Sequence, residues 1–181
     1  MRELSLHILD IIQNSITAEA TLIQVIIEEN IKDDQLLIKV IDNGSGMNKG
    51  QEKDVLDPFI TSRTTRDVGL GLPLFKAAAK RCEGDFKLES NLDLGTKVVA
   101  SFRHSHIDRA PLGDIVGTII TFLVSNPKLD LVYQHKFNEQ KFEFDTREVK
   151  NNLGPKLEIN DPQVLDWIEG YLTDNLEQLR R

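Results

Sequence analysis

The first twenty residues carry their apolar side chains at the spacing of an amphipathic helix. Leu4, Ile8, Ile11, Ile12 and Ile16 fall on one stripe at 3.6 residues per turn. This stripe predicts a helix over about residues 3–18 that packs against a core.

A second stripe on the same helix is polar and contains Glu3, His7, Asp10, Asn14 and Thr17. Asp and Asn are poor helix formers, so they are unusual choices for a plain solvated face. Asp10 and Asn14 are four residues apart and project side by side. A carboxylate beside a carboxamide suits Mg²⁺ and a reacting water, although a solvated face remains the alternative.

Apolar runs and turn residues predict the remaining elements. An antiparallel hairpin is expected from strands 22–29 and 35–41, packed on the first helix. The other expected elements are a helix ending near residue 82, strands 85–90 and 96–103, a helix over 112–125, a hairpin of 129–136 with 141–145, and a final helix from residue 161. The final helix has an apolar stripe, which serves either core packing or a partner or dimer face.

The segment from Asp42 to Met47 follows the second strand of that hairpin and reads Asp-Asn-Gly-Ser-Gly-Met. Its glycines, Gly44 and Gly46, permit positive φ and allow close approach to the backbone. An ordinary hairpin turn is one interpretation, and a binding loop is the other.

Residues 48–68 lose regular periodicity and become polar, which predicts a functional loop or lid. Arg63 and Arg66 within it suit phosphate oxygens. The stretch Gly69, Leu70, Gly71 and Leu72 then opens a helix, whose first N–H groups and positive dipole end favour an anion.

Composition narrows the class of protein. A formal net charge of −7 argues against nucleic acid as a partner. The sequence shows no signal peptide and no apolar run of the roughly 18 residues that a membrane helix needs, which predicts a cytoplasmic protein without a membrane partner.

These motifs, in this order, resemble the ATP-binding domain shared by gyrase, histidine kinases and MutL, called the GHKL or Bergerat fold. Asp10 to Thr21 is similar to the MutL-type N box, whereas 57–72 and Gly95-Thr96 look more like a histidine kinase. The resemblance implies an α/β two-layer sandwich with a mixed, largely antiparallel sheet under helices. It covers roughly residues 1–103, and residues 104–181 would form a small C-terminal α/β regulatory or docking region.

The resemblance also implies a role for each motif, with ATP and Mg²⁺ as cofactors. Asp42 would accept a hydrogen bond from the adenine amino group and select ATP over GTP. Asn14 would coordinate Mg²⁺, and Asp10 would be the catalytic base. The remaining nucleotide-binding residues would be Gly44, Gly46, Met47 and Thr96 near the adenine, with Arg63, Arg66, Gly69, Leu70, Gly71 and Leu72 near the phosphates.

Two departures from the family pattern leave the reaction open. Asp10 occupies a position where hydrolytic members carry Glu, and a carboxylate misplaced by about 1 Å can cost on the order of a hundredfold in rate. No helical hairpin with a phosphoacceptor His precedes the domain, so a complete sensor histidine kinase is not expected.

The leading hypothesis is a nucleotide-dependent regulator that transfers phosphate to another protein or hydrolyses ATP slowly, with a homodimer left open. One alternative is a non-catalytic, anti-sigma-like or kinase-partner module whose output lies in the C-terminal region. The other alternative is a degenerate domain that binds no nucleotide.

Overall fold

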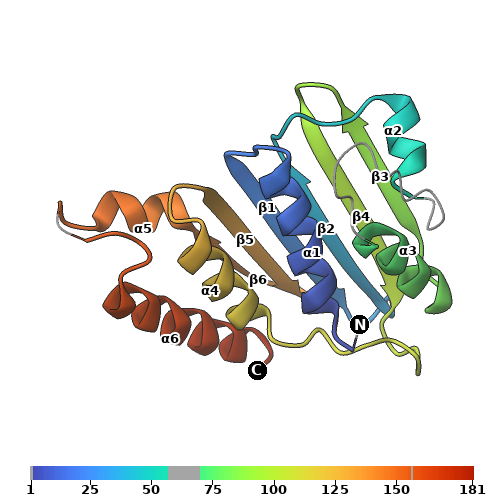
Figure 1. Cartoon of the computed structure of the whole chain (residues 1–181). Coiled ribbons are helices and arrows are strands. Elements are labelled where there is room, and N and C mark those ends of the chain that lie inside the picture. The colour runs from blue at the N-terminus through green and yellow to red at the C-terminus, as the bar shows by residue number, and fades with distance from the viewer. Residues whose placement is uncertain (1, 57–69, 156) are drawn as a thin grey trace.

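One six-stranded sheet runs through the whole molecule (Figure 1). The computed structural model describes residues 2–56, 70–155 and 157–181. The strands lie side by side in the order β3-β4-β2-β1-β5-β6. Their bounds are β1 Leu22–Asn30, β2 Gln35–Asp42, β3 Phe86–Asn91, β4 Gly95–Arg103, β5 Asp130–Phe137 and β6 Gln140–Asp145. Among these described strands, β1 and β5 pair in parallel and the other four pairings are antiparallel.

The long helices form a second layer on one face of the sheet (Figure 1). In β1 the side chains alternate strictly between buried and half-buried, because one face of the sheet is covered and the other is open. The helix bounds are α1 Leu4–Thr17, α2 Lys49–Asp54, α3 Gly71–Arg81, α4 Ile115–Ser125, α5 Thr146–Asn152 and α6 Pro162–Leu179. The predicted two-layer α/β fold with a mixed, largely antiparallel sheet is therefore confirmed.

The apolar patterns located most elements correctly. The first helix, the antiparallel hairpin of β1 and β2, and the last helix all lie within a few residues of their expected bounds. The helix expected from residue 112 begins at Ile115 instead, because the Asp114 side chain accepts a hydrogen bond from the Gly117 N–H and caps the helix there.

Two short helices were not predicted. The structure forms α2 in the segment interpreted as irregular, where Asn48 and Gln51 make a reciprocal capping box. The second unpredicted helix is α5, where the Asp145 side chain caps the first turn by accepting a hydrogen bond from the Arg147 N–H. The rest of the predicted lid, with Arg63 and Arg66, lies outside the described residues, and so does Gly69.

The C-terminal region shares the sheet and the core with the region before it. Strand β5 pairs along β1 from Leu22 opposite Asp130 to Glu29 opposite Phe137. Apolar side chains of both regions form one buried cluster. A domain boundary near residue 103 stays a prediction. None of the described helices combines the length and the hydropathy that a membrane span requires.

Candidate functional site

The Asp42 side chain is held from three directions at the end of β2. It is 9% exposed. Its Oδ1 accepts from the backbone N–H groups of Gly44, at 2.9 Å, and Thr96, at 3.2 Å. Its Oδ2 accepts from the Ser15 hydroxyl at 2.8 Å. Three segments, α1, β2 and β4, thus fix the orientation of one buried carboxylate.

Ser15 was missed from the sequence, although a signal for it was present. It lies on the apolar side of α1 and is 1% exposed, and a hydroxyl buried among isoleucines needs a partner. The long-range contact with Asp42 supplies that partner. This contact also ties α1 to the end of β2.

Ser90 on β3 is a second residue that sequence reasoning missed. Its hydroxyl accepts from the Met47 N–H at 2.9 Å, donates to the Gly95 carbonyl at 3.1 Å, and lies 2.8 Å from the Thr96 hydroxyl. Met47 and Thr96, both predicted from the sequence, are therefore brought together through this buried side chain. Nothing in the local sequence distinguishes Ser90 from any other serine in a strand.

The two glycines of the Asp42–Met47 segment are required by close packing. A Cβ on Gly44 would lie 2.6 Å from the Ala18 carbonyl oxygen. Gly46 has φ +62°, and a Cβ there would lie 1.9 Å from the Asn91 carbonyl oxygen. The loop therefore fits tightly between the end of α1 and the turn that follows β3.

Asp10 and the start of α3 also meet. A Cβ on Gly71 would lie 2.9 Å from both Cβ and Oδ2 of Asp10. Burial raises the pKa of Asp10 above its ordinary value. The α3 helix has no side-chain cap at Leu70, and Leu72 behind it is buried.

Asn14 is half-buried one turn further along the same face of α1. Its side-chain amide makes no hydrogen bond to any residue that the structure describes. Helix α1 thus carries one set of polar groups from Asp10, beside α3, to Ser15, beside Asp42. His7, on the same helix, is buried and stacks on Phe75 with ring centroids 5.1 Å apart. Burial is the main reason that its pKa falls to about 4.

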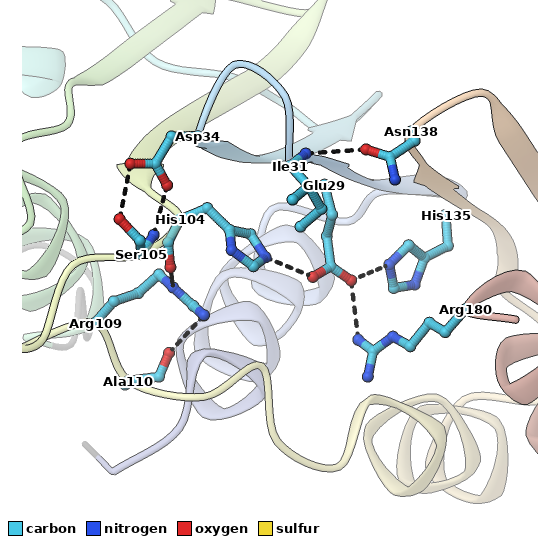
Figure 2. Close-up of polar contacts among 10 residues, drawn as sticks. All are labelled: Glu29, Ile31, Asp34, His104, Ser105, Arg109, Ala110, His135, Asn138 and Arg180. Carbon is cyan, nitrogen blue, oxygen red and sulfur yellow. Dashed lines mark hydrogen bonds and ion pairs between the residues drawn. The ribbon is translucent and has the colours of Figure 1, made fainter.

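A second buried carboxylate, Glu29, lies at the opposite end of β1 and was not predicted (Figure 2). Its Oε1 accepts from His135 Nε2 at 2.8 Å and from Arg180 at 2.9 Å, and its Oε2 accepts from His104 Nε2 at 3.1 Å. Burial alone raises the pKa of Glu29, but these three donors outweigh it and lower the pKa to about 2. We call these four residues the Glu29 cluster.

Glu29 and His135 are buried in the Glu29 cluster, whereas the His104 and Arg180 side chains are 21% and 51% exposed. His135 is 1% exposed, and its Nδ1 lies 2.8 Å from the hydroxyl of Tyr133, which is fully buried. The donors to Glu29 come from the segment between β4 and α4, from β5 and from the end of α6, so the cluster joins the C-terminal region to β1. No three His, Cys, Asp or Glu residues within the described ranges are grouped to hold a metal ion.

Comparison with known proteins places these features in a family. Residues 2–106 match the family model described as "Histidine kinase-, DNA gyrase B-, and HSP90-like ATPase". Among solved structures, the Aquifex aeolicus MutL ATPase domain complexed with ADP superposes with a TM-score of 0.55 at 16% identity, covering 78% of this chain and 64% of that one. The N-terminal domain of a DNA repair protein superposes with a TM-score of 0.54 at 15% identity, covering 79% of this chain and 52% of that one. At these identities the two structures show the fold alone.

Two curated relatives are named as sensors. A "Putative sensor protein" of Shewanella frigidimarina is 29% identical over 93 residues, which are 50% of this chain and 14% of that protein. A "Probable C4-dicarboxylate sensor kinase" of Halalkalibacterium halodurans is 36% identical over 69 residues, which are 38% of this chain and 12% of that protein. This chain therefore spans less than one sixth of the length of either relative.

Proposed function

We propose that this chain, which belongs to the family of histidine kinase-, DNA gyrase B- and HSP90-like ATPases, binds ATP with Mg²⁺ as a nucleotide-dependent regulator of another protein. The observation that carries the proposal is the Asp42 carboxylate. It is held by Ser15 and by two backbone N–H groups, all of them small donors.

The proposed adenine-binding end of the site rests on the capacity of the Asp42 carboxylate to accept a further hydrogen bond. Asp42 Oδ2 accepts one hydrogen bond, from Ser15, and a carboxylate oxygen can accept another. The 6-amino group of adenine is a donor, whereas guanine carries an acceptor oxygen at the same position. Asp42 therefore favours ATP over GTP. Met47 and Thr96, fixed through Ser90, would line the same end.

The phosphate end would form between α1 and the start of α3. The Asn14 side-chain oxygen suits Mg²⁺, because hard cations prefer oxygen ligands, and the ion would supply charge neutralisation of the phosphates. The uncapped N–H groups at Gly71 and Leu72 suit phosphate oxygens. Arg63, Arg66, Gly69 and Leu70 remain proposed contributors from the sequence.

Asp10 decides between two forms of the proposal. In phosphotransfer or hydrolysis its carboxylate would take the proton of the acceptor hydroxyl or water, and a pKa raised by burial makes it a better base. The second candidate is a non-catalytic switch that needs only different nucleotide affinities in two conformations. Close packing of Asp10 against Gly71 favours this second form, since the short carboxylate has little room to advance.

Calorimetry with Mg·ATP and Mg·GTP tests the binding proposal. We expect Mg·ATP to bind more tightly than Mg·GTP, and Asp42→Asn to lose roughly tenfold or more in ATP affinity, as for loss of a hydrogen bond to a charged group. Asp33→Asn, in the exposed turn between β1 and β2, is the matched control and should bind as wild type. Equal affinity for both nucleotides, or an Asp42→Asn variant that binds normally, would contradict the proposal.

A turnover assay with γ-labelled ATP separates the two forms. If Asp10→Asn binds Mg·ATP normally but loses phosphate release or transfer, Asp10 acts as a base. If the wild-type protein shows no turnover while nucleotide changes its protease sensitivity, the switch form stands. A protein that binds Mg·ATP with neither response would contradict both forms.

A further inference from the structure

Two aromatic side chains are stacked on the outer surface of α6. Trp167 is 56% exposed and Tyr171 is 39% exposed. Their ring centroids lie 5.2 Å apart with an interplanar angle of 13°. Residues 167 and 171 are one helical turn apart, and Gly170 between them has open space where a Cβ would be. Each ring covers one face of the other, and the remaining surface of both rings is partly exposed to solvent.

This aromatic pair lies beside the last strand of the sheet. The Tyr171 ring centroid is 5.8 Å from that of Phe142 and 6.5 Å from that of Phe144, and both phenylalanines belong to β6. Within the described ranges, the backbone of β6 pairs with β5 alone. Its outward N–H and C=O groups are therefore available to an added strand.

The helix that carries the aromatic pair is negatively charged. Between Pro162 and Leu179 the sequence contains no Lys or Arg. Exposed acidic residues on α6 are Asp166, Glu169, Asp174 and Glu177. In the described part of the chain, Glu177 alone among them has a cationic partner, Arg181 at 3.6 Å. We call α6 with β6 the aromatic–acidic surface.

We propose that the aromatic–acidic surface docks an extended, arginine- or lysine-bearing segment of another protein. The segment adds to the sheet along the free edge of β6, so its alternate side chains fall on the same side as Phe142 and Phe144. A cationic side chain on that side of the added strand reaches the exposed surface of the Trp167 and Tyr171 rings. The π system attracts the cation, and the acidic groups of α6 attract it as well.

Charge selects this occupant over others. A second copy would bring another acidic α6 and another net charge of −7 to the interface, and like charges oppose that pairing. Nucleic acid and anionic lipid surfaces are repelled for the same reason. The surface lies outside the family-matched residues 2–106, so the proposal does not rest on nucleotide binding.

The test uses the full chain without nucleotide and a fluorescein-labelled peptide of eight residues that alternates Thr and Arg. The chain contains a single tryptophan, Trp167, so quenching of its emission reports occupation of this surface directly. We expect quenching by the Arg peptide and none by a Thr–Glu peptide. Anisotropy should show affinity that falls steeply between 50 and 300 mM salt.

Variants and modified peptides separate the contributions. Trp167→Ala should weaken Arg-peptide binding about fivefold, and Asp166→Asn with Glu169→Gln and Asp174→Asn about tenfold at low salt. Methylating every backbone nitrogen of the peptide should also weaken binding, because it removes the strand pairing. Asp33→Asn, in the turn between β1 and β2, is the control and should bind unchanged.

Three results would overturn the proposal. The first is that the Arg peptide does not bind at millimolar concentration. The second is that the Trp167→Ala variant binds the Arg peptide as tightly as the wild type does. The third is that the wild type forms a concentration-dependent dimer that Trp167→Ala abolishes. The last result would identify a second copy as the occupant. Circular dichroism of each variant confirms that it is folded before its binding is interpreted.

Discussion

The two ends of the β1–β2 hairpin each bury a carboxylate, and they satisfy it in different ways. Asp42 receives one hydroxyl and two backbone N–H groups. Glu29 receives two imidazoles and a guanidinium from three distant segments (Figure 2). Small, neutral donors leave space beside a carboxylate for a ligand, whereas large side chains enclose it. The same chemical group joins two regions of the chain at the Glu29 end, and we propose that it recognises adenine at the Asp42 end.

Glu29→Gln should give the largest effect, because it removes the one negative charge that faces Arg180 and both histidines. We expect a loss of about 3 kcal/mol in the free energy of unfolding, measured by urea denaturation at pH 7. The control is Glu28→Gln, one residue earlier on the open face of β1. Glu28 pairs with Lys39 at 2.8 Å in a half-exposed site and should lose less than about 1 kcal/mol. Equal losses would show that the Glu29 cluster contributes no special stability.

The pH dependence of stability should follow the Glu29 pKa. Its folded value of about 2 lies below its ordinary value of 4.5, so the ionised form stabilises the fold. This contribution is complete above about pH 5 and is lost as the pH falls toward 2. The difference in unfolding free energy between wild type and Glu29→Gln should therefore shrink from pH 6 to pH 3. A constant difference over that range would contradict the assignment.

Gly46→Ala should disturb the loop beside Asp42 and cause an intermediate loss in the free energy of unfolding. Its φ of +62° and the 1.9 Å approach of a new Cβ to the Asn91 carbonyl both oppose alanine, and we expect a loss of about 2 kcal/mol. Mg·ATP affinity should fall with it. Gly170→Ala on α6 is the matched control, since an open helical position should gain up to about 1 kcal/mol. A neutral Gly46→Ala variant would show that the loop tolerates rearrangement.

Ser15→Ala should give the smallest effect on stability, because it removes one hydrogen bond to Asp42. We expect about 1 kcal/mol in unfolding free energy and a reduced preference for Mg·ATP over Mg·GTP, measured by calorimetry. Ser5→Ala, near the start of the same helix, should leave the nucleotide preference unchanged. If Ser15→Ala keeps the full preference, Asp42 is oriented by the backbone donors alone.

The sequence predicted those parts of the fold that depend on local pattern. Alternation along 22–29 and 35–41 located the hairpin and placed Asp42 at its end, and helical spacing located α1. The capping box of Asn48 and Gln51 was also present in the sequence, but a helix of one and a half turns is too short to show apolar periodicity.

The Glu29 cluster could not be predicted, because it depends on a non-local pairing. The parallel register that sets Ile27 opposite His135 brings the imidazole to Glu29, and no local pattern fixes that register. One signal was available: Glu29 falls in phase with the buried residues Ile23, Val25 and Ile27 of β1. A carboxylate at a core position predicts buried partners, although it does not identify them.

The sequence separation of the donors sets an order in which the two ends are completed during synthesis. Asp42 has its last donor once Thr96 is made, 54 residues later. Glu29 must wait 75 residues for His104, 106 for His135 and 151 for Arg180. At about 5–20 residues per second, the last donor is made roughly 7 to 28 seconds after the hairpin itself. A ribosome-bound chain therefore has every donor to Asp42, its proposed recognition end, while Glu29 still lacks the Arg180 guanidinium.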